Sequence, residues 1–337
     1  MPDPLGRVDL RSDTVTRPTP EMRQAMADAE VGDDGFGDDP TVARLEAAFA
    51  ERVGKEASLF VPSGTMANQI ALRLLGPPGT VVLVGRRQHV VVREAAAPGR
   101  NAAAQLVALD DADGTIDPDE VARWVADARV GWAEASAVFV EDTHGEVGGR
   151  VWPLERLAAV ASAGLPMHLD GARLWNAAVA SGTSVAERAA PATTVTCCIS
   201  KGLGAPVGSL LAGPVDLVAR ARVERKRLGG GMRQVGILAA AGLLALDRVD
   251  RLAEDHERAR RLAHAAAARW PGSVDVGLVH TNIVRIAVGD PRPVLAHLRE
   301  RDVLAVPGSA DTVRLVTHAD IDDADVERAV TALETAP

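Results

Sequence analysis

The sequence lacks the features that would take it out of the class of ordinary soluble proteins. Its only two cysteines, Cys197 and Cys198, are adjacent, so they cannot connect distant segments, and they suit a reducing cytoplasmic setting. Basic residues number 37 against 46 acidic ones, and the net charge of −9 argues against a nucleic-acid-binding surface. The longest apolar stretches, such as 236–246, are too short to span a bilayer. The first four residues show neither a basic nor an apolar targeting region, so we expect no signal peptide.

The length of 337 residues suffices for one large α/β domain and a smaller one. Short apolar runs alternate with helical patterns, which predicts βαβ units and a mostly parallel sheet. Strands are expected at 58–61, 81–84, 137–140, 167–169, 194–199 and 208–211. Helices are expected at 40–52, 65–75, 118–128, 154–163 and 232–246, with a connecting helix at 248–269.

A second pattern follows the connecting helix. It predicts a strand at 280–288, a helix at 292–301, a strand at 312–316 and a helix at 322–333. We therefore place a domain boundary near residue 247. Residues 1–247, including the N-terminal segment, are expected to form the large domain, and residues 248–337 a small C-terminal α+β domain.

The chemical signals lie where expected strands end, which is where open α/β sheets bind their ligands. The strand at 58–61 leads into Ser63, Gly64 and Thr65 at the start of a helix. The backbone N–H groups and the positive dipole of a helix N-terminus form an anion site, and Gly64 would let the backbone approach closely. A plain helix cap is the alternative and commoner interpretation of such a motif.

A carboxylate, Asp170, ends the expected strand at 167–169 and is followed by Arg173. A carboxylate in this position can hold a pyridinium N–H and keep it protonated, which makes the ring an electron sink for a carbanion. A structural Asp–Arg pair or a helix cap is the alternative. Asp170 with His168 and His144 also suggests metal ligands, but their spacing fits no specific metal pattern, so no metal is predicted.

A lysine, Lys201, follows the apolar run 194–199 and precedes the glycine-rich turn at 202–208. Desolvation at such a place lowers the pKa of an amine and favours Schiff-base chemistry. An exposed loop lysine is the alternative, and no P-loop pattern is present. An anion cradle, a strand-end aspartate and a strand-end lysine are together the components of a pyridoxal-phosphate (PLP) site.

At this point the sequence resembles a known family, the threonine aldolases, which are PLP enzymes of fold type I. The motifs that carry the resemblance are the three strand ends above together with DLRSDTVT (9–16), VGDD (31–34), GDDPT (37–41), GGGMRQ (229–234) and VRLVTH (313–318). The segments 12–16, 200–209 and 229–234 are the most specific. These motifs extend from the N-terminus to the last quarter, so the resemblance covers nearly the whole chain.

The resemblance implies an aspartate-aminotransferase-like fold and a retro-aldol lyase that cleaves L-threonine or L-allo-threonine to glycine and acetaldehyde. It implies that Lys201 carries the cofactor as a Schiff base. By position, the catalytic residues would be Lys201, His89 and Asp170, with His89 stacking on the ring. The cofactor would be held by Ser63, Gly64, Thr65, His89, Asp170, Arg173, Lys201, Lys226 and Arg233. The substrate carboxylate would be bound by Ser12, Arg173 and Arg314, since an arginine fork fixes both charge and orientation.

The basic segment 224–228 and the turn after it imply a further feature. In the enzymes that this chain resembles, the active site lies at a dimer interface. Lys226 and Arg233 would therefore serve the cofactor of the partner subunit, in a homodimer or a homotetramer built from two dimers. A solvated helix end is the alternative interpretation of such a basic run.

The sequence departs from the family at several positions. Phe36 stands where a tyrosine is usual, and Trp132 lies in a loop where many members have a second active-site histidine. The base for the β-hydroxyl would then be His89, a water or the phosphate. After Glu94 the chain has alanines where glycines are usual.

The function alternatives that remain open are a β-eliminating lyase and an aldolase for a bulkier substrate such as phenylserine. A third alternative is a non-catalytic, regulatory PLP-binding protein. The sequence has no appended DNA-binding segment or basic patch, which argues against a regulator. The lack of a G-x-G-x-x-G motif at the start of a helix after a first strand argues against a dinucleotide-binding dehydrogenase.

Overall fold

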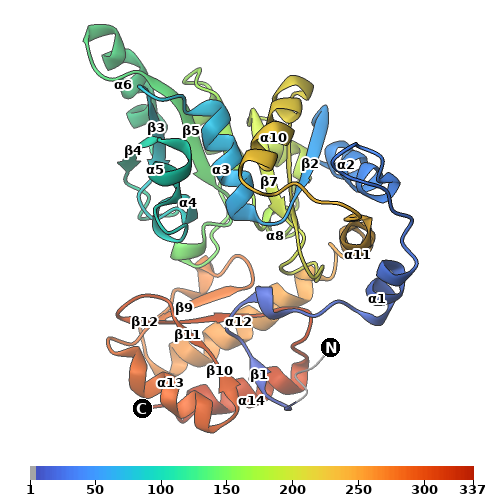
Figure 1. The fold of residues 1–337 in the computed structure, drawn as a ribbon. Helices are drawn as coiled ribbons and strands as arrows, with labels where there is room; N and C mark the ends of the chain where they lie inside the picture. The colour runs from blue at the N-terminus through green and yellow to red at the C-terminus, as the bar shows by residue number, and fades with distance from the viewer. Residues whose placement is uncertain (1–4) are drawn as a thin grey trace.

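The computed structural model describes residues 5–337, which form two packed parts (Figure 1). The larger part is built on a seven-stranded sheet in the order β2-β8-β7-β6-β5-β3-β4, in which only β8 is antiparallel to its neighbours. Its strands are β2 (Ala57–Val61), β3 (Val81–Gly85), β4 (Gln105–Leu109), β5 (Ala135–Glu141), β6 (Met167–Asp170), β7 (Thr194–Cys198) and β8 (Ser209–Gly213). Strands β3, β6, β7 and β8 are buried along their whole length, as strands covered by helices on both faces should be.

The helices of this part connect and cover the strands. They are α1 (Pro20–Ala27), α2 (Pro40–Val53), α3 (Gly64–Leu75), α4 (His89–Val92), α5 (Ala97–Ala102), α6 (Pro118–Asp127), α7 (Leu154–Ala161), α8 (Leu174–Ser181), α9 (Val185–Ala189), α10 (Val215–Arg227) and α11 (Gly236–Leu246). Local chemistry sets where they begin. Ser63 caps α3 by accepting from the backbone N–H of Met66, and Asp39 caps α2 directly before a proline.

The smaller part, at the bottom of Figure 1, carries an antiparallel sheet in the order β11-β12-β9. Its strands are β9 (Ile283–Ala287), β11 (Val306–Pro307) and β12 (Thr312–Val316), and its helices are α12 (Leu252–Arg269), α13 (Pro291–Glu300) and α14 (Asp323–Glu334). The long helix α12 joins the two parts. Leu252 at its start belongs to the core of the large part, whereas Ala259 onward belongs to the second core.

The N-terminal segment packs differently from the expected domain division. Strand β1 (Val8–Asp9) pairs in parallel with β10 (Val303–Leu304), and Val8 and Leu10 are buried in the core of the small part. Residues 5–12 therefore extend the C-terminal part, whereas the sequence pattern groups them with the large domain. Such a pairing between opposite ends of the chain leaves no local pattern in the sequence.

Most expected elements are present, with shifted ends. The exceptions are informative. Strand β4 was not among the expected strands; its residues 105–109 lie at the edge of the sheet and are only partly buried, although 106–109 are apolar. Helix α11 begins at Gly236 rather than at residue 232, since the glycine-rich turn before it stays irregular. Within residues 5–337 we find no helix with the length and apolar character needed to cross a membrane. The start of the chain, on which the signal-peptide expectation depends, lies outside the described residues.

Candidate active site

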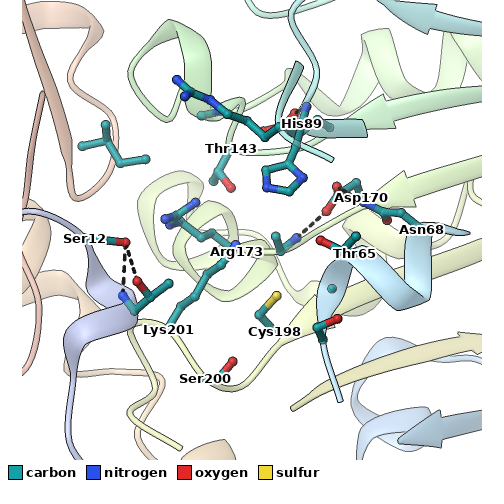
Figure 2. A pocket seen from close by; sticks show the side chains of 18 of the residues that line it. Ser12, Thr65, Asn68, His89, Thr143, Asp170, Arg173, Cys198, Ser200 and Lys201 are labelled. Carbon is teal, nitrogen blue, oxygen red and sulfur yellow. Dashed lines mark hydrogen bonds between the residues drawn. The ribbon is translucent and has the colours of Figure 1, made fainter. Parts of the chain in front are cut away.

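A cavity of about 360 Å³ opens where the strands β5, β6 and β7 end, facing the small part (Figure 2). This is the edge at which open α/β sheets bind ligands. It brings together residues from both ends of the chain. Of the site residues expected from the sequence, the cavity is lined by Ser12, Ser63, Gly64, Thr65, His89, Asp170, Arg173, Lys201 and Arg314.

One end of the cavity is the N-terminus of α3. The first N–H groups of a helix have no partner inside the helix, so those of Gly64 and Thr65 are available to an anion. A Cβ at position 64 would come within 3.0 Å of the Sγ of Cys198, which leaves little room for any larger residue. Glycine at this position therefore keeps the backbone close to the floor of the cavity.

Asp170 ends β6 and is almost fully buried. Its Oδ2 accepts a hydrogen bond of 2.7 Å from Asn68 Nδ2, and its Oδ1 accepts one of 3.1 Å from the backbone N–H of Ala172. A carboxylate held at both oxygens has a fixed direction, and Asp170 presents itself to the cavity beside His89 (Figure 2).

His89 begins the short helix α4 and lies over the cavity. Its backbone N–H donates to Glu141 Oε2 at 2.6 Å, and its Nδ1 lies 2.9 Å from Glu94 Oε1. Burial alone would lower the pKa of His89, but the hydrogen bond to Glu94 and the charges of Asp170 and Glu141 raise it. The imidazole therefore has a carboxylate partner at one nitrogen and its other nitrogen remains for a ligand.

Lys201 follows β7 and reaches into the cavity beside Cys198 and Ser200 (Figure 2). Its Nζ makes no hydrogen bond or ion pair with any other residue in the range 5–337. Its backbone carbonyl is fixed by Thr16 Oγ1 at 3.1 Å and by the N–H of Gly204 at 2.9 Å. The base of the side chain is thus anchored while the amine is unengaged.

Arg173 lines the cavity, but most of its guanidinium is already engaged. Its Nε and Nη2 donate to the two oxygens of Asp13 at 2.7 and 2.8 Å, and Asn282 donates to the same carboxylate at 3.1 Å. Burial opposes the charge on Asp13, yet the neighbouring Arg173 and Lys201 hold the pKa of this carboxyl well below its usual range. The expected ligand contact of Arg173 is therefore restricted to its remaining nitrogen, Nη1.

Arg314, on β12, approaches the cavity from the small part. Its Nη2 donates to the backbone carbonyl of Arg11 at 3.1 Å, whereas its buried Nε has no partner among residues 5–337. Burial and the charge of Arg173 lower its pKa, which is the electrostatic signature of a cation short of counter-charge. Ser12 lies nearby, with its hydroxyl accepting from the N–H of Thr14 at 3.2 Å.

The structure places four other residues of interest outside the cavity. Lys226 and Arg233 are exposed, and the Nε of Arg233 lies 3.8 Å from an oxygen of Asp33. Trp132 packs edge-on against Trp124, and Phe36 is 83% exposed. In a single chain, therefore, Lys226 and Arg233 do not reach the site, and Trp132 does not shape it.

Several polar residues of the site were missed from the sequence. Glu94 and Asn68 are buried against Asp170 and His89. Glu141, the last residue of β5, and Thr143 also line the cavity, and Thr143 has a φ of 61° that a β-branched residue rarely adopts. The polar residues 141–144 at the end of an apolar strand are a signal that would have identified these two.

The arrangement of His89, Glu94 and Asp170 also bears on metal binding. Their ligand atoms lie within 4.8 Å of one another, as in a metal site. However, the amide Nδ2 of Asn68 donates to both carboxylates, at 2.7 and 2.8 Å. The lone pairs of Glu94 Oε1 and Asp170 Oδ2 that a metal ion would need therefore already accept hydrogen bonds from Asn68. We interpret the three residues as a hydrogen-bonded cluster.

The parallel sheet, the strand-end cavity and the small C-terminal part define an enzyme of the fold-type-I class. The solved structure of Leishmania major threonine aldolase has this fold, with a TM-score of 0.82 at 21% identity, covering 97% of this chain and 98% of that one. The model of the beta-eliminating lyase family matches residues 9–289.

Sequence relatives give a closer relation. A low specificity L-threonine aldolase of Escherichia coli K12 is 42% identical over 93% of this chain and 94% of its own length. A probable low-specificity L-threonine aldolase of Arabidopsis thaliana is 39% identical over 99% and 98%. The chain therefore belongs to the beta-eliminating lyase family and, within it, to the threonine aldolases.

Proposed function

We propose that the protein is a PLP-dependent aldolase that cleaves L-threonine, L-allo-threonine and related β-hydroxy-α-amino acids to glycine and an aldehyde. One observation carries the proposal. A single cavity places the unengaged amine of Lys201 among a helix N-terminus, the carboxylate of Asp170 and the guanidinium of Arg314. Relatives of similar length with 39–42% identity, named as low-specificity L-threonine aldolases, support it.

The residues present fit the cofactor. The N–H groups of Gly64 and Thr65 are suited to bind the phosphate of the cofactor, and Ser63 caps the helix that carries them. Asp170 is suited to pair with the ring nitrogen of the cofactor, and His89 to stack on the face of its ring. Lys201 is suited to bond to the aldehyde carbon of the cofactor. When bound, the cofactor supplies the electron sink that makes cleavage of the Cα–Cβ bond feasible.

The chain's own residues then have separate tasks. Arg314 and Ser12 would bind the substrate carboxylate, since both line the cavity and only the Nη2 of Arg314 has a partner among residues 5–337. The ring nitrogen of His89 opposite Glu94 would accept the proton of the β-hydroxyl. Glu94 would hold the imidazole in place and stabilise its charged form, as a carboxylate does behind a general base.

The decisive test exploits the low lysine content of the chain, whose only lysines are Lys55, Lys201 and Lys226. Borohydride reduction of the protein mixed with PLP, followed by peptide mapping, is expected to label Lys201. Lys201→Ala should abolish both the label and threonine cleavage, whereas Lys55→Ala, which removes an amine bound to the carbonyl of Ala192, should keep both. A label on Lys55 or Lys226 would refute the assignment.

A second candidate, β-elimination, is favoured by the family model that matches residues 9–289. The two reactions differ in products. Aldolase cleavage of threonine gives glycine and acetaldehyde, whereas elimination gives ammonia and a keto acid. An assay of both product pairs on threonine and phenylserine distinguishes them and also measures the preference for bulky side chains.

The same proposal includes the assembly, a homodimer or a homotetramer in the cytoplasm with shared sites. Lys226 and Arg233 are exposed outside the cavity of their own chain, and Phe36, on the loop that bonds to the Arg233 carbonyl, is 83% exposed. Lys226 and Arg233 would serve the cofactor of the partner. Mixing inactive Lys201→Ala chains with inactive Arg233→Ala chains should restore part of the activity, and no recovery in verified mixed dimers would contradict shared sites.

A further inference from the structure

Asn68 lies on α3, one turn after the residues that face the phosphate position, and its side chain lines the cavity wall (Figure 2). It is 1% exposed. Its Nδ2 donates to Asp170 Oδ2 at 2.7 Å and to Glu94 Oε1 at 2.8 Å. One amide nitrogen thus donates its two hydrogens to two different carboxylates. Asp170 faces the expected position of the cofactor ring, and Glu94 is the partner of His89.

The orientation of this amide is fixed from behind by His168. The Oδ1 of Asn68 lies 3.1 Å from His168 Nε2, and His168 Nδ1 lies 2.9 Å from the hydroxyl of Thr194. Complete burial lowers the pKa of His168 to about 4, so the ring is neutral at pH 7. Because Oδ1 can only accept, Nε2 must carry the single ring proton and Nδ1 must accept from Thr194.

Every hydrogen in this chain of bonds therefore has one direction. A flipped Asn68 amide would place its oxygen against two carboxylates and its NH₂ group against an N–H donor. The relay Thr194–His168–Asn68 ends on Asp170 and Glu94, and both of these carboxylates are more than nine-tenths buried. Glu94 accepts in addition from Gln69 Nε2 at 2.7 Å and lies against His89 Nδ1.

We infer that Asn68 is a positioning residue that holds Asp170 and Glu94 as two separate, correctly directed carboxylates and so couples the cofactor side of the site to His89. The part that concerns Asp170 and the ring nitrogen rests on the proposed function. The part that concerns Glu94 and His89 depends only on the protein.

The physical need for such a bridge follows from the crowding of charge. The ligand atoms of His89, Glu94 and Asp170 lie within 4.8 Å, and two buried carboxylates at this separation tend to share a proton. A shared proton would weaken Asp170 as the partner of a pyridinium and Glu94 as the partner of His89. Asn68 supplies a donor to each oxygen without adding a charge or a titrating group.

The test begins with the apoprotein, so that it does not depend on cofactor binding. NMR titration of His89 in Asn68→Ala is expected to show an upward shift of the titration midpoint. Glu94 Oε1 would lose the hydrogen bond from Asn68 and would therefore stabilise the charged form of His89 more strongly. Asn176→Ala is the matched control: Asn176 is buried and bonds to His256 at 3.1 Å, but it does not line the cavity. The control should leave the His89 midpoint unchanged.

An unshifted His89 midpoint in a folded Asn68→Ala protein would overturn the inference, whether or not the protein binds PLP. If this variant does not fold, Asn68→Asp keeps the side-chain shape, replaces the donor by an acceptor and should shift the midpoint further upward. An unchanged midpoint in that variant would have the same consequence.

The second measurement uses the protein with PLP. Asn68→Ala should weaken PLP binding by about tenfold, as expected for the loss of one donor to a buried carboxylate, and should make the visible absorption band depend on pH near neutrality. Asn176→Ala should do neither. Unchanged affinity and spectrum would remove Asp170 from the inference. If the wild-type protein itself binds no PLP, the proposed function fails, and the His89 titration still decides the role of Asn68.

Discussion

The two walls of the cavity differ in how their charged side chains are held. On the wall formed by the large part, both oxygens of Asp170, both oxygens of Glu94 and the amide nitrogen of Asn68 have partners. On the wall formed by the two chain ends, the buried Nε of Arg314 has none among residues 5–337. The carboxylates of the first wall are held within one folding unit, whereas the second wall contains a buried donor without a partner.

The second wall also crosses the boundary between the two parts. Glu146, near the cavity mouth, receives Arg93 Nε at 2.7 Å from the large part and Arg285 Nη1 at 3.1 Å from β9 of the small part. The wall that would face the cofactor is therefore fixed by the sheet of the large part. The wall that would face the substrate depends on how the two parts are held together. Changes on the two sides should therefore produce different kinetic effects.

The largest effect is expected at the wall that carries Asp170. Asp170→Asn should reduce kcat by on the order of 10²–10³-fold, because a neutral amide no longer stabilises a positive charge on the ring, while Tm stays close to that of the wild type. Asp255→Asn provides the contrast: this buried carboxylate pairs with Arg251 at the start of α12, does not line the cavity and should affect Tm rather than kcat. Near-normal turnover in Asp170→Asn would remove the distinction between the walls.

At the other wall, Arg314→Ala should mainly raise KM for threonine, with a loss of about 2–5 kcal/mol if the substrate carboxylate is left buried and unpaired. The visible absorption of bound PLP should not change. Arg292→Ala, which breaks an exposed pair with Asp290, is the control and should leave KM as it is. An unaltered KM in Arg314→Ala would show that Arg314 does not serve the substrate.

The bridge at Glu146 should give a smaller effect. Glu146→Gln is expected to cost about 1 kcal/mol in kcat/KM, since the pairs are only partly buried and are screened by salt. Comparing kcat/KM at low and high ionic strength tests this: the difference in kcat/KM between variant and wild type should shrink as salt is added. A salt-independent difference would point to a role other than the ion pairs.

The pH dependence of this bridge follows from the same contacts. Burial would raise the pKa of Glu146, but Arg93 and Arg285 lower it below the ordinary value of 4.5. A carboxyl whose pKa is lowered on folding stabilises the protein above its unfolded value. The contribution should thus be fully present at pH 7 and be lost as the pH falls from about 4.5 through the lower folded value. Glu146→Gln should flatten this part of the stability profile.

The smallest expected effect concerns the strained backbone that follows Glu94. Ala95 and Ala96 have φ angles of 51° and 58°, where glycine is the residue without a steric penalty. Ala95→Gly should raise the free energy of unfolding by about 0.5–1 kcal/mol, since relief of strain exceeds the entropy gained by the unfolded chain. Ala48→Gly, inside helix α2, should instead lower it. Urea unfolding of both variants checks the sign, and a loss in Ala95→Gly would contradict the strain.

The sequence by itself determined what local patterns encode. The apolar runs predicted most of the strands, and the residues at their ends predicted the positions of Lys201, Asp170 and the Ser63–Thr65 turn at one edge of the sheet. These are short-range features, because a buried strand and a helix cap are visible within a few neighbouring residues.

Only the tertiary structure decided the contacts between distant segments. It joined β1 to β10, engaged Arg173 with Asp13, left Nε of Arg314 without a partner and placed Asn68 between Asp170 and Glu94. None of these residues is unusual in its own stretch of sequence. Their roles arise because the fold removes water from them and fixes which donor meets which acceptor, and that pairing has no periodicity along the chain.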